Sequence, residues 1–124
     1  MEAKKVLYGD DKEEKRNALA NALRLRNLEV ELASTPQELV AKARANKYDA
    51  VITDLEYTPE GREGYDVLRQ IRKLPALKVL YSGVCGFEYA AEAFESGADY
   101  AILRKDQSQL MELLDKELGG QNGR

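Results

Sequence analysis

Short apolar segments alternate with longer amphipathic segments along this chain of 124 residues, and this alternation constrains the fold more than any other feature. One apolar run, Ala50-Val51-Ile52-Thr53, suits a strand that is buried on both faces. Between such runs, apolar residues recur at helical spacing, as at Leu19, Ala22 and Leu23. Strands that alternate with helices pair in parallel through right-handed crossovers. We therefore predict an α/β fold, a doubly wound five-stranded parallel sheet with helices on both faces.

Local patterns indicate where the elements begin and end. The expected strands are residues 6–8, 28–32, 50–53, 79–81 and 100–103, and the first helix is expected over residues 12–27. Residues 28–32 alternate between apolar and polar side chains, which is typical of a strand at a sheet edge. Thr35-Pro36-Gln37-Glu38 has the pattern of a capping box, and Gly97 that of a helix C-cap. Asp106 or Ser108 caps the last helix. We expect one domain over residues 1–118 and a disordered tail over residues 119–124.

Composition excludes several classes of function. The 19 basic and 22 acidic residues give a net charge of −3 without a basic run, so nucleic acid is not an expected partner. The chain has no histidine, which excludes Ser-His-Asp hydrolysis, histidine-ligated zinc and a phosphohistidine of its own. With Cys85 as the one cysteine and no long apolar segment, we expect no intrachain disulfide, no membrane contact and a cytoplasmic location.

Polar residues follow most of the predicted strands at the end where each strand finishes. These residues are Asp10 and Asp11, Asp54, Ser82, and Arg104 with Lys105. In a doubly wound sheet the ligand site lies beyond the carboxyl ends of the strands, so these side chains are expected to share one crevice. Carboxylates packed together repel unless a cation lies among them, and oxygen ligands suit Mg²⁺. A carboxylate beside Mg²⁺, with a hydroxyl and a cation nearby, can receive a phosphoryl group.

Each of these residues also has an ordinary structural explanation. Asp10 or Asp11 alone is more typical of a helix N-cap, and Ser82-Gly83 alone is typical of a turn. The agreement of several strand ends on one chemistry is what favours the functional interpretation.

At these positions the chain resembles the receiver domains of two-component response regulators, from Lys5 to about Leu118. The matching segments are Val6-Leu7-Tyr8-Gly9-Asp10-Asp11, Ala50-Val51-Ile52-Thr53-Asp54, Val79-Leu80-Tyr81-Ser82-Gly83 and residues 97–105. The resemblance implies a flavodoxin-like fold with strand order 2-1-3-4-5. It also implies a protein that is not an enzyme, beyond assisting its own phosphorylation and dephosphorylation.

The resemblance further implies a role for each residue of the crevice. Asp54 would accept a phosphoryl group from a sensor histidine kinase or phosphotransfer protein. The Mg²⁺ ion would be held by Asp10, Asp11, Asp54 and the backbone carbonyl of Glu56. Ser82 would bind the phosphoryl group, and the surface around the fourth strand, fourth helix and fifth strand would change for a downstream protein partner.

The chain departs from the family pattern in three places. The loop after Asp54 is about two residues longer than usual, with Gly64 correspondingly late. Counting from Gly97 places Arg104 where the family has lysine, and Ala101 where it has a switch aromatic. Arginine and lysine are not interchangeable at such a site. We favour Lys105 as the crevice cation on chemical grounds, which requires a bulge in the fifth strand; a regular strand would place Arg104 there instead.

Two other functions remain open. A receiver-like interaction module could keep the acids and bind partners without phosphorylation, and the altered fifth strand favours this interpretation. A Mg²⁺-dependent phosphohydrolase of haloacid-dehalogenase type fits less well, because its Asp-x-Asp nucleophile motif is absent after the first strand, where the chain reads Asp10-Asp11.

Overall fold

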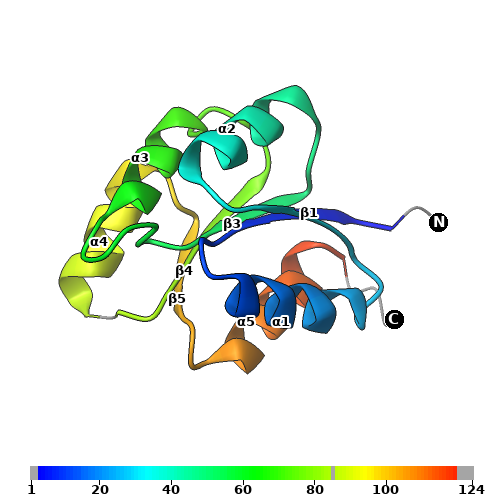
Figure 1. The fold of residues 1–124 in the computed structure, drawn as a ribbon. Helices are drawn as coiled ribbons and strands as arrows, with labels where there is room; N and C mark the ends of the chain where they lie inside the picture. The colour runs from blue at the N-terminus through cyan, green and yellow to red at the C-terminus, as the bar shows by residue number, and fades with distance from the viewer. Residues whose placement is uncertain (1–2, 85, 120–124) are drawn as a thin grey trace.

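A computed structural model describes residues 3–84 and 86–119 of the chain, in which strands and helices alternate as predicted (Figure 1). Cys85 and residues 120–124 of the expected tail lie outside the described residues. The elements are β1 Lys5–Gly9, α1 Glu13–Arg24, β2 Glu29–Ala33, α2 Pro36–Ala45, β3 Ala50–Thr53, α3 Glu63–Gln70, β4 Leu77–Ser82, α4 Phe87–Ser96, β5 Tyr100–Leu103 and α5 Gln107–Glu117. Within the part of the chain described, no helix is long and apolar enough to cross a membrane.

The five strands form one parallel sheet in the order β2-β1-β3-β4-β5, which confirms the predicted fold and strand order. Strand β2 lies on one side of β1, and β3 lies on the other. The strand order therefore reverses at β1 and β3, and a crevice opens beyond their carboxyl ends in such sheets. As expected from its alternating sequence, β2 is an edge strand.

The helices cover the sheet from both sides, with α1 and α5 on one face and α2, α3 and α4 on the other (Figure 1). Strand residues alternate between the two cores because successive side chains point to opposite faces. In β1, Val6 and Tyr8 pack with residues of α1 and α5, whereas Leu7 packs with residues of α2. Every residue of β3 is buried, as its apolar, β-branched sequence predicts.

The ends of the first two helices differ in detail from the sequence prediction. Helix α1 ends at Arg24 rather than Asn27, because Leu25 is exposed and Asn27 adopts a left-handed conformation with φ 66°. The Thr35 hydroxyl accepts a hydrogen bond from Glu38 N at 3.0 Å, as a capping box requires. The Glu38 carboxylate, however, accepts from the backbone N–H of Ser34 rather than from that of Thr35.

Two aspartates fix the amino ends of neighbouring strands by the same pair of bonds. Asp49, just before β3, accepts a hydrogen bond from Lys5 N at 2.8 Å and donates its own N–H to Lys5 O. Asp99, just before β5, accepts from Lys78 N at 2.9 Å and donates to Lys78 O. Asp49 thereby joins β3 to β1, and Asp99 joins β5 to β4, at the end of the sheet farthest from the predicted crevice.

Candidate functional site

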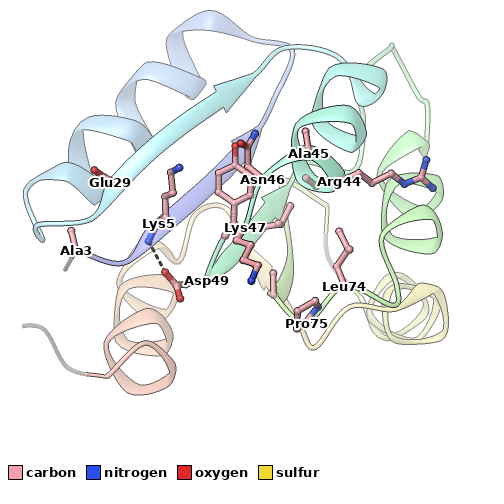
Figure 2. A pocket seen from close by; sticks show the side chains of 14 residues that line it. Ala3, Lys5, Glu29, Arg44, Ala45, Asn46, Lys47, Asp49, Leu74 and Pro75 are labelled. Carbon is pink, nitrogen blue, oxygen red and sulfur yellow. Dashed lines mark hydrogen bonds between the residues drawn. The ribbon is translucent and has the colours of Figure 1, made fainter. Parts of the chain in front are cut away.

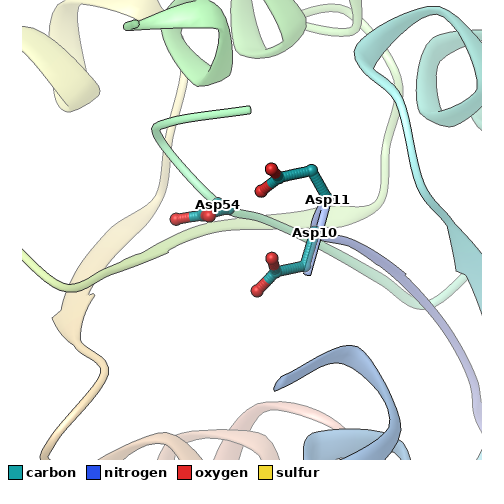
Figure 3. A group of neighbouring side chains, drawn as sticks. All are labelled: Asp10, Asp11 and Asp54. Atoms are coloured by element: carbon teal, nitrogen blue, oxygen red, sulfur yellow. The ribbon is translucent and has the colours of Figure 1, made fainter. Parts of the chain in front are cut away.

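Three carboxylates meet at the carboxyl ends of β1 and β3 (Figure 3). Asp10 and Asp11 follow β1, and Asp54 follows β3. One oxygen from each carboxylate lies within 4.8 Å of the others, although Asp54 is far from Asp10 and Asp11 in the chain. The predicted acidic cluster is therefore present in the fold.

Asp10 is fully buried, and its carboxylate accepts three hydrogen bonds from the protein. Its Oδ1 accepts from Lys12 N at 2.9 Å, and its Oδ2 accepts from the Tyr8 hydroxyl at 2.6 Å and from Arg104 Nη2 at 3.1 Å. The bond from Lys12 N closes a local turn, but the N-cap of α1 is Lys12, so the ordinary explanation of Asp10 or Asp11 as the helix N-cap was wrong. One oxygen of Asp10 thus holds the loop after β1, and the other contacts the cation of the crevice.

The Asp54 carboxylate is buried beside Arg104. Its Oδ1 accepts from Leu55 N at 2.8 Å and lies 3.0 Å from Arg104 Nη2. Burial raises the pKa of Asp54 to about 6, helped by the charge of Asp10 and opposed by that of Arg104. Among the described residues, the hydrogen bond and the ion pair of this carboxylate both involve Oδ1, which leaves Oδ2 without a protein donor.

Arg104, not Lys105, supplies the cation of the crevice, so the preference for Lys105 was wrong. The paired register runs unbroken from Val79 opposite Tyr100 to Ser82 opposite Leu103, without the bulge that Lys105 requires. Arg104 continues the ladder with a 2.7 Å bond from its N–H to Ser82 O. Its guanidinium lies 5.9 Å from the ring centroid of Tyr81, while Lys105 is exposed.

The remaining predicted residues lie on β4, on β5 and in the loop after β3, and the contacts of their side chains are local. The Ser82 hydroxyl is buried at the end of β4, where it accepts from Val84 N at 3.1 Å. Glu56 follows Asp54 in the loop after β3, with a partly buried side chain. Ala101 packs at the edge of the core formed with α3 and α4, and the Tyr100 hydroxyl donates outward to Glu117 at 2.9 Å.

The long loop after Asp54 is closed by Glu63 at the start of α3. The Glu63 carboxylate accepts from Tyr57 N at 3.0 Å and from the Thr58 hydroxyl. Gly64 then packs directly on Asp54, because a Cβ at this position would lie 2.3 Å from Asp54 O. The extra residues therefore form a turn of their own and leave the backbone of Asp54 held by α3.

Tyr8 is a site residue that the sequence prediction missed. It is buried under the crevice and donates the shortest hydrogen bond received by Asp10, and both burial and this bond raise its pKa. A usable pattern was present, since residues two apart on a strand point to the same face. A tyrosine two positions before Asp10 therefore places its hydroxyl on the side of that carboxylate.

A hollow of about 1280 Å³ lies at the opposite end of the sheet from the acids (Figure 2). It is broad and open, and its lining mixes Lys5, Arg44 and Lys47 with Leu74 and Pro75. The Asp49 carboxylate at its edge already accepts from the backbone of Lys5. Polar groups do not converge there as they do at the acids, so the acidic crevice is the candidate site.

The donors of the crevice fit a hard divalent cation. Asp11 Oδ1 is buried and has no hydrogen-bond partner among the described residues. Together with the free Asp54 Oδ2, it presents carboxylate oxygens that no protein donor satisfies. Such oxygens are the ligands that Mg²⁺ prefers, and the acidic triad is typical of a Mg²⁺ site.

Comparisons with known proteins show which sequences and folds this chain is similar to. The chain is 31% identical over 101 residues to the transcriptional regulatory protein ResD of Bacillus subtilis, covering 81% of this chain and 41% of that relative. Its fold matches a CheY-like receiver domain protein from Methanospirillum hungatei with a TM-score of 0.84 and 24% identity, covering 97% of both chains. It also matches the response regulator TrrA of Thermotoga maritima, solved in complex with Mg²⁺-BeF, with a TM-score of 0.79 and 25% identity, covering 91% of this chain and 97% of that one.

The family resemblance is confirmed by sequence over almost the whole fold. The sequence pattern of the response regulator receiver domain matches residues 6–115, from β1 into α5. That span includes all three acids of the crevice, whose arrangement suits two-component signalling through a phosphoaspartate. The chain therefore belongs to the response regulator receiver domain family.

Proposed function

We propose that Asp54 accepts a phosphoryl group from the phosphohistidine of a partner histidine kinase or phosphotransfer protein. The observation that carries this proposal is the position of the Asp54 carboxylate, which shares one crevice with two other acids and with Arg104 at 3.0 Å. Its Oδ2 has no protein donor among the described residues, so a lone pair is available for attack on phosphorus. The pKa of about 6 keeps most of the carboxylate ionised at neutral pH.

In the proposed reaction an Asp54 oxygen forms a bond to phosphorus as the bond from phosphorus to the donor's histidine nitrogen breaks. Arg104 would stabilise charge on the transferred phosphoryl oxygens, and the Ser82 hydroxyl would bind one of them. Asp10, Asp11, Asp54 and the backbone carbonyl of Glu56 would hold Mg²⁺. When bound, Mg²⁺ would neutralise negative charge on the phosphoryl group. The similar response regulator TrrA was solved in complex with Mg²⁺-BeF, which supports Mg²⁺ as the metal.

Receiver domains are not conventional enzymes, so the phosphohydrolase alternative is set aside. We propose that phosphorylation changes the surface of β4, α4 and β5 and that this surface binds a downstream protein. We also propose that residues 1–118 form one receiver domain. A cytoplasmic location is proposed as well, since the sequence has one cysteine and therefore no disulfide framework.

One feature favours the second candidate, a receiver-like module that binds partners without phosphorylation. Arg104 already contacts two of the three acids, and Ala101 stands where the family has a switch aromatic. If Arg104 keeps the acids occupied and no aromatic side chain switches, the partner-binding surface would be the same with and without phosphorylation.

Intact mass spectrometry separates the two candidates. The purified chain is incubated with Mg²⁺ and acetyl phosphate, with Asp54→Ala as the matched control. Phosphorylation adds about 80 Da to the wild type and nothing to the control, because one phosphoryl group is transferred to one carboxylate. An unchanged wild-type mass favours the interaction module, and an adduct on Asp54→Ala refutes Asp54 as the acceptor.

A further inference from the structure

We propose that Tyr8 is a positioning residue that makes Arg104 and Mg²⁺ alternative occupants of one oxygen, Asp10 Oδ2. The inference rests on the proposed metal site and adds a residue to it. Tyr8 would not touch the metal or the phosphoryl group; it would act through the Asp10 carboxylate.

The argument begins with the number of contacts that Asp10 Oδ2 can accept. A carboxylate oxygen has two lone pairs. In this structure the Tyr8 hydroxyl takes one at 2.6 Å, and Arg104 Nη2 takes the other at 3.1 Å. No lone pair of Asp10 Oδ2 is left for a metal ion while both donors remain in place.

Of the two donors, Arg104 is the one that can leave. Tyr8 is fully buried in the core between β1 and helices α1 and α5, and its hydroxyl makes the shorter bond. Arg104 lies at the end of β5 with a side chain 22% exposed, and the same Nη2 also serves Asp54 Oδ1. A long side chain at the rim can move aside, whereas moving Tyr8 would open the core.

The surroundings of Arg104 provide a place for the released guanidinium. The guanidinium lies beside the Tyr81 ring, and Gly83 has no side chain to crowd Nη1, from which an added Cβ would lie at an ordinary contact distance of 3.5 Å. Arg104 Nε is buried and has no hydrogen-bond partner among the described residues. The displaced guanidinium could therefore pack on the Tyr81 ring and form a new hydrogen bond through Nε.

The test measures Mg²⁺ binding by isothermal titration calorimetry at constant ionic strength in wild type, Tyr8→Phe, Arg104→Met and the double variant. Tyr8→Phe frees one lone pair, so Arg104 and Mg²⁺ can share the oxygen, and Kd should fall by about three- to tenfold, the scale of one net hydrogen bond. Arg104→Met should also lower Kd. The double variant should gain nothing beyond Arg104→Met, because the competition is already gone.

Tyr48→Phe is the matched control, since Tyr48 also donates from its hydroxyl to a carboxylate, Glu31, at 2.7 Å, but at the far end of the sheet. It should leave Kd unchanged. A second readout is the side-chain ¹⁵N resonance of Arg104, assigned by its loss in Arg104→Lys. Mg²⁺ should shift this resonance strongly in wild type and weakly in Tyr8→Phe.

Equal Kd values in wild type and Tyr8→Phe would overturn the inference, because a metal ion that uses Asp10 Oδ1 is indifferent to Tyr8. Additive effects in the double variant would overturn it as well. If none of the four proteins binds Mg²⁺, the proposed metal site fails and the inference fails with it. The measurement does not depend on phosphorylation, so a chain that binds Mg²⁺ as expected but gains no mass would refute only the phosphoacceptor role.

Discussion

At the scale of single residues, a single nitrogen of Arg104 connects two buried carboxylates. This arrangement assigns the cationic role to Arg104 rather than to its exposed neighbour, Lys105. We predict that Arg104→Met lowers the initial rate of Asp54 phosphorylation by acetyl phosphate about tenfold or more at saturating Mg²⁺, because a donor to the phosphoryl oxygens is lost. Lys105→Met, which removes a cation one position away, should leave the rate unchanged. Intact mass against time gives both rates, and a slow Lys105→Met would restore the original preference.

Asp54 itself should oppose folding at neutral pH. The carboxyl has a pKa of about 6 in the folded protein and 3.8 as a free side chain, so the folded state binds more protons between these values. Stability therefore falls as pH rises from about 4 to about 6. An asparagine amide mimics the protonated acid, so metal-free Asp54→Asn should be more stable than wild type by about 3 kcal/mol at pH 7 and nearly equally stable near pH 4. Urea unfolding in EDTA at several pH values measures this, and a constant difference across the series would contradict it.

At the scale of elements, the start of α3 is built against the backbone of Asp54. A Cβ on Gly64 would lie 2.3 Å from Asp54 O, whereas one on Gly83 would meet only the end of the Arg104 side chain at 3.5 Å. We predict that Gly64→Ala costs about 2 kcal/mol of unfolding free energy, as overpacking does. Gly83→Ala should change it by less than about 0.5 kcal/mol. Urea unfolding compares the two variants, and equal losses would show that α3 does not hold Asp54.

Elements were predictable from the sequence where the polarity of their residues matches their burial in the fold. The apolar, β-branched residues of β3 gave the bounds of a central strand, and that strand delivers Asp54 to the crevice. The three acids followed from the rule that strand ends share one edge of the sheet. Family membership was predictable because these acids and strands occur together in one order.

What could not be predicted depends on packing between distant segments. Strand β4 begins at Leu77, earlier than expected, because pairing with β3 extends it beyond its apolar run. The choice between Arg104 and Lys105 depended on the register of β5 against β4, which residue chemistry alone does not reveal. The bond from Tyr8 to Asp10 had a pattern in the sequence, but a tyrosine in a buried strand is first explained as core.

At the scale of the whole molecule, metal binding should stabilise the fold. Binding to the native state alone raises stability by mass action, by about 1–2 kcal/mol at ~10 mM Mg²⁺ for a millimolar Kd. Asp54→Asn should gain less, because it lacks one charged ligand. Thermal melts with Mg²⁺ and with NaCl at equal ionic strength make the comparison, and a wild-type midpoint that ignores Mg²⁺ would refute the metal site.

The two strand-locking aspartates, Asp49 and Asp99, have a consequence for how such a chain can vary. They anchor β3 to β1 and β5 to β4 at the amino ends, so the strands are aligned from the end away from the crevice. The alignment of the strands then does not depend on the loops at the crevice. An inserted or lengthened loop there, like the one Glu63 closes after Asp54, can change without displacing the strand ends. The strands thus stay aligned at their amino ends while the loops at their carboxyl ends are exchanged. Loop grafting in this protein would be best attempted with both aspartates kept.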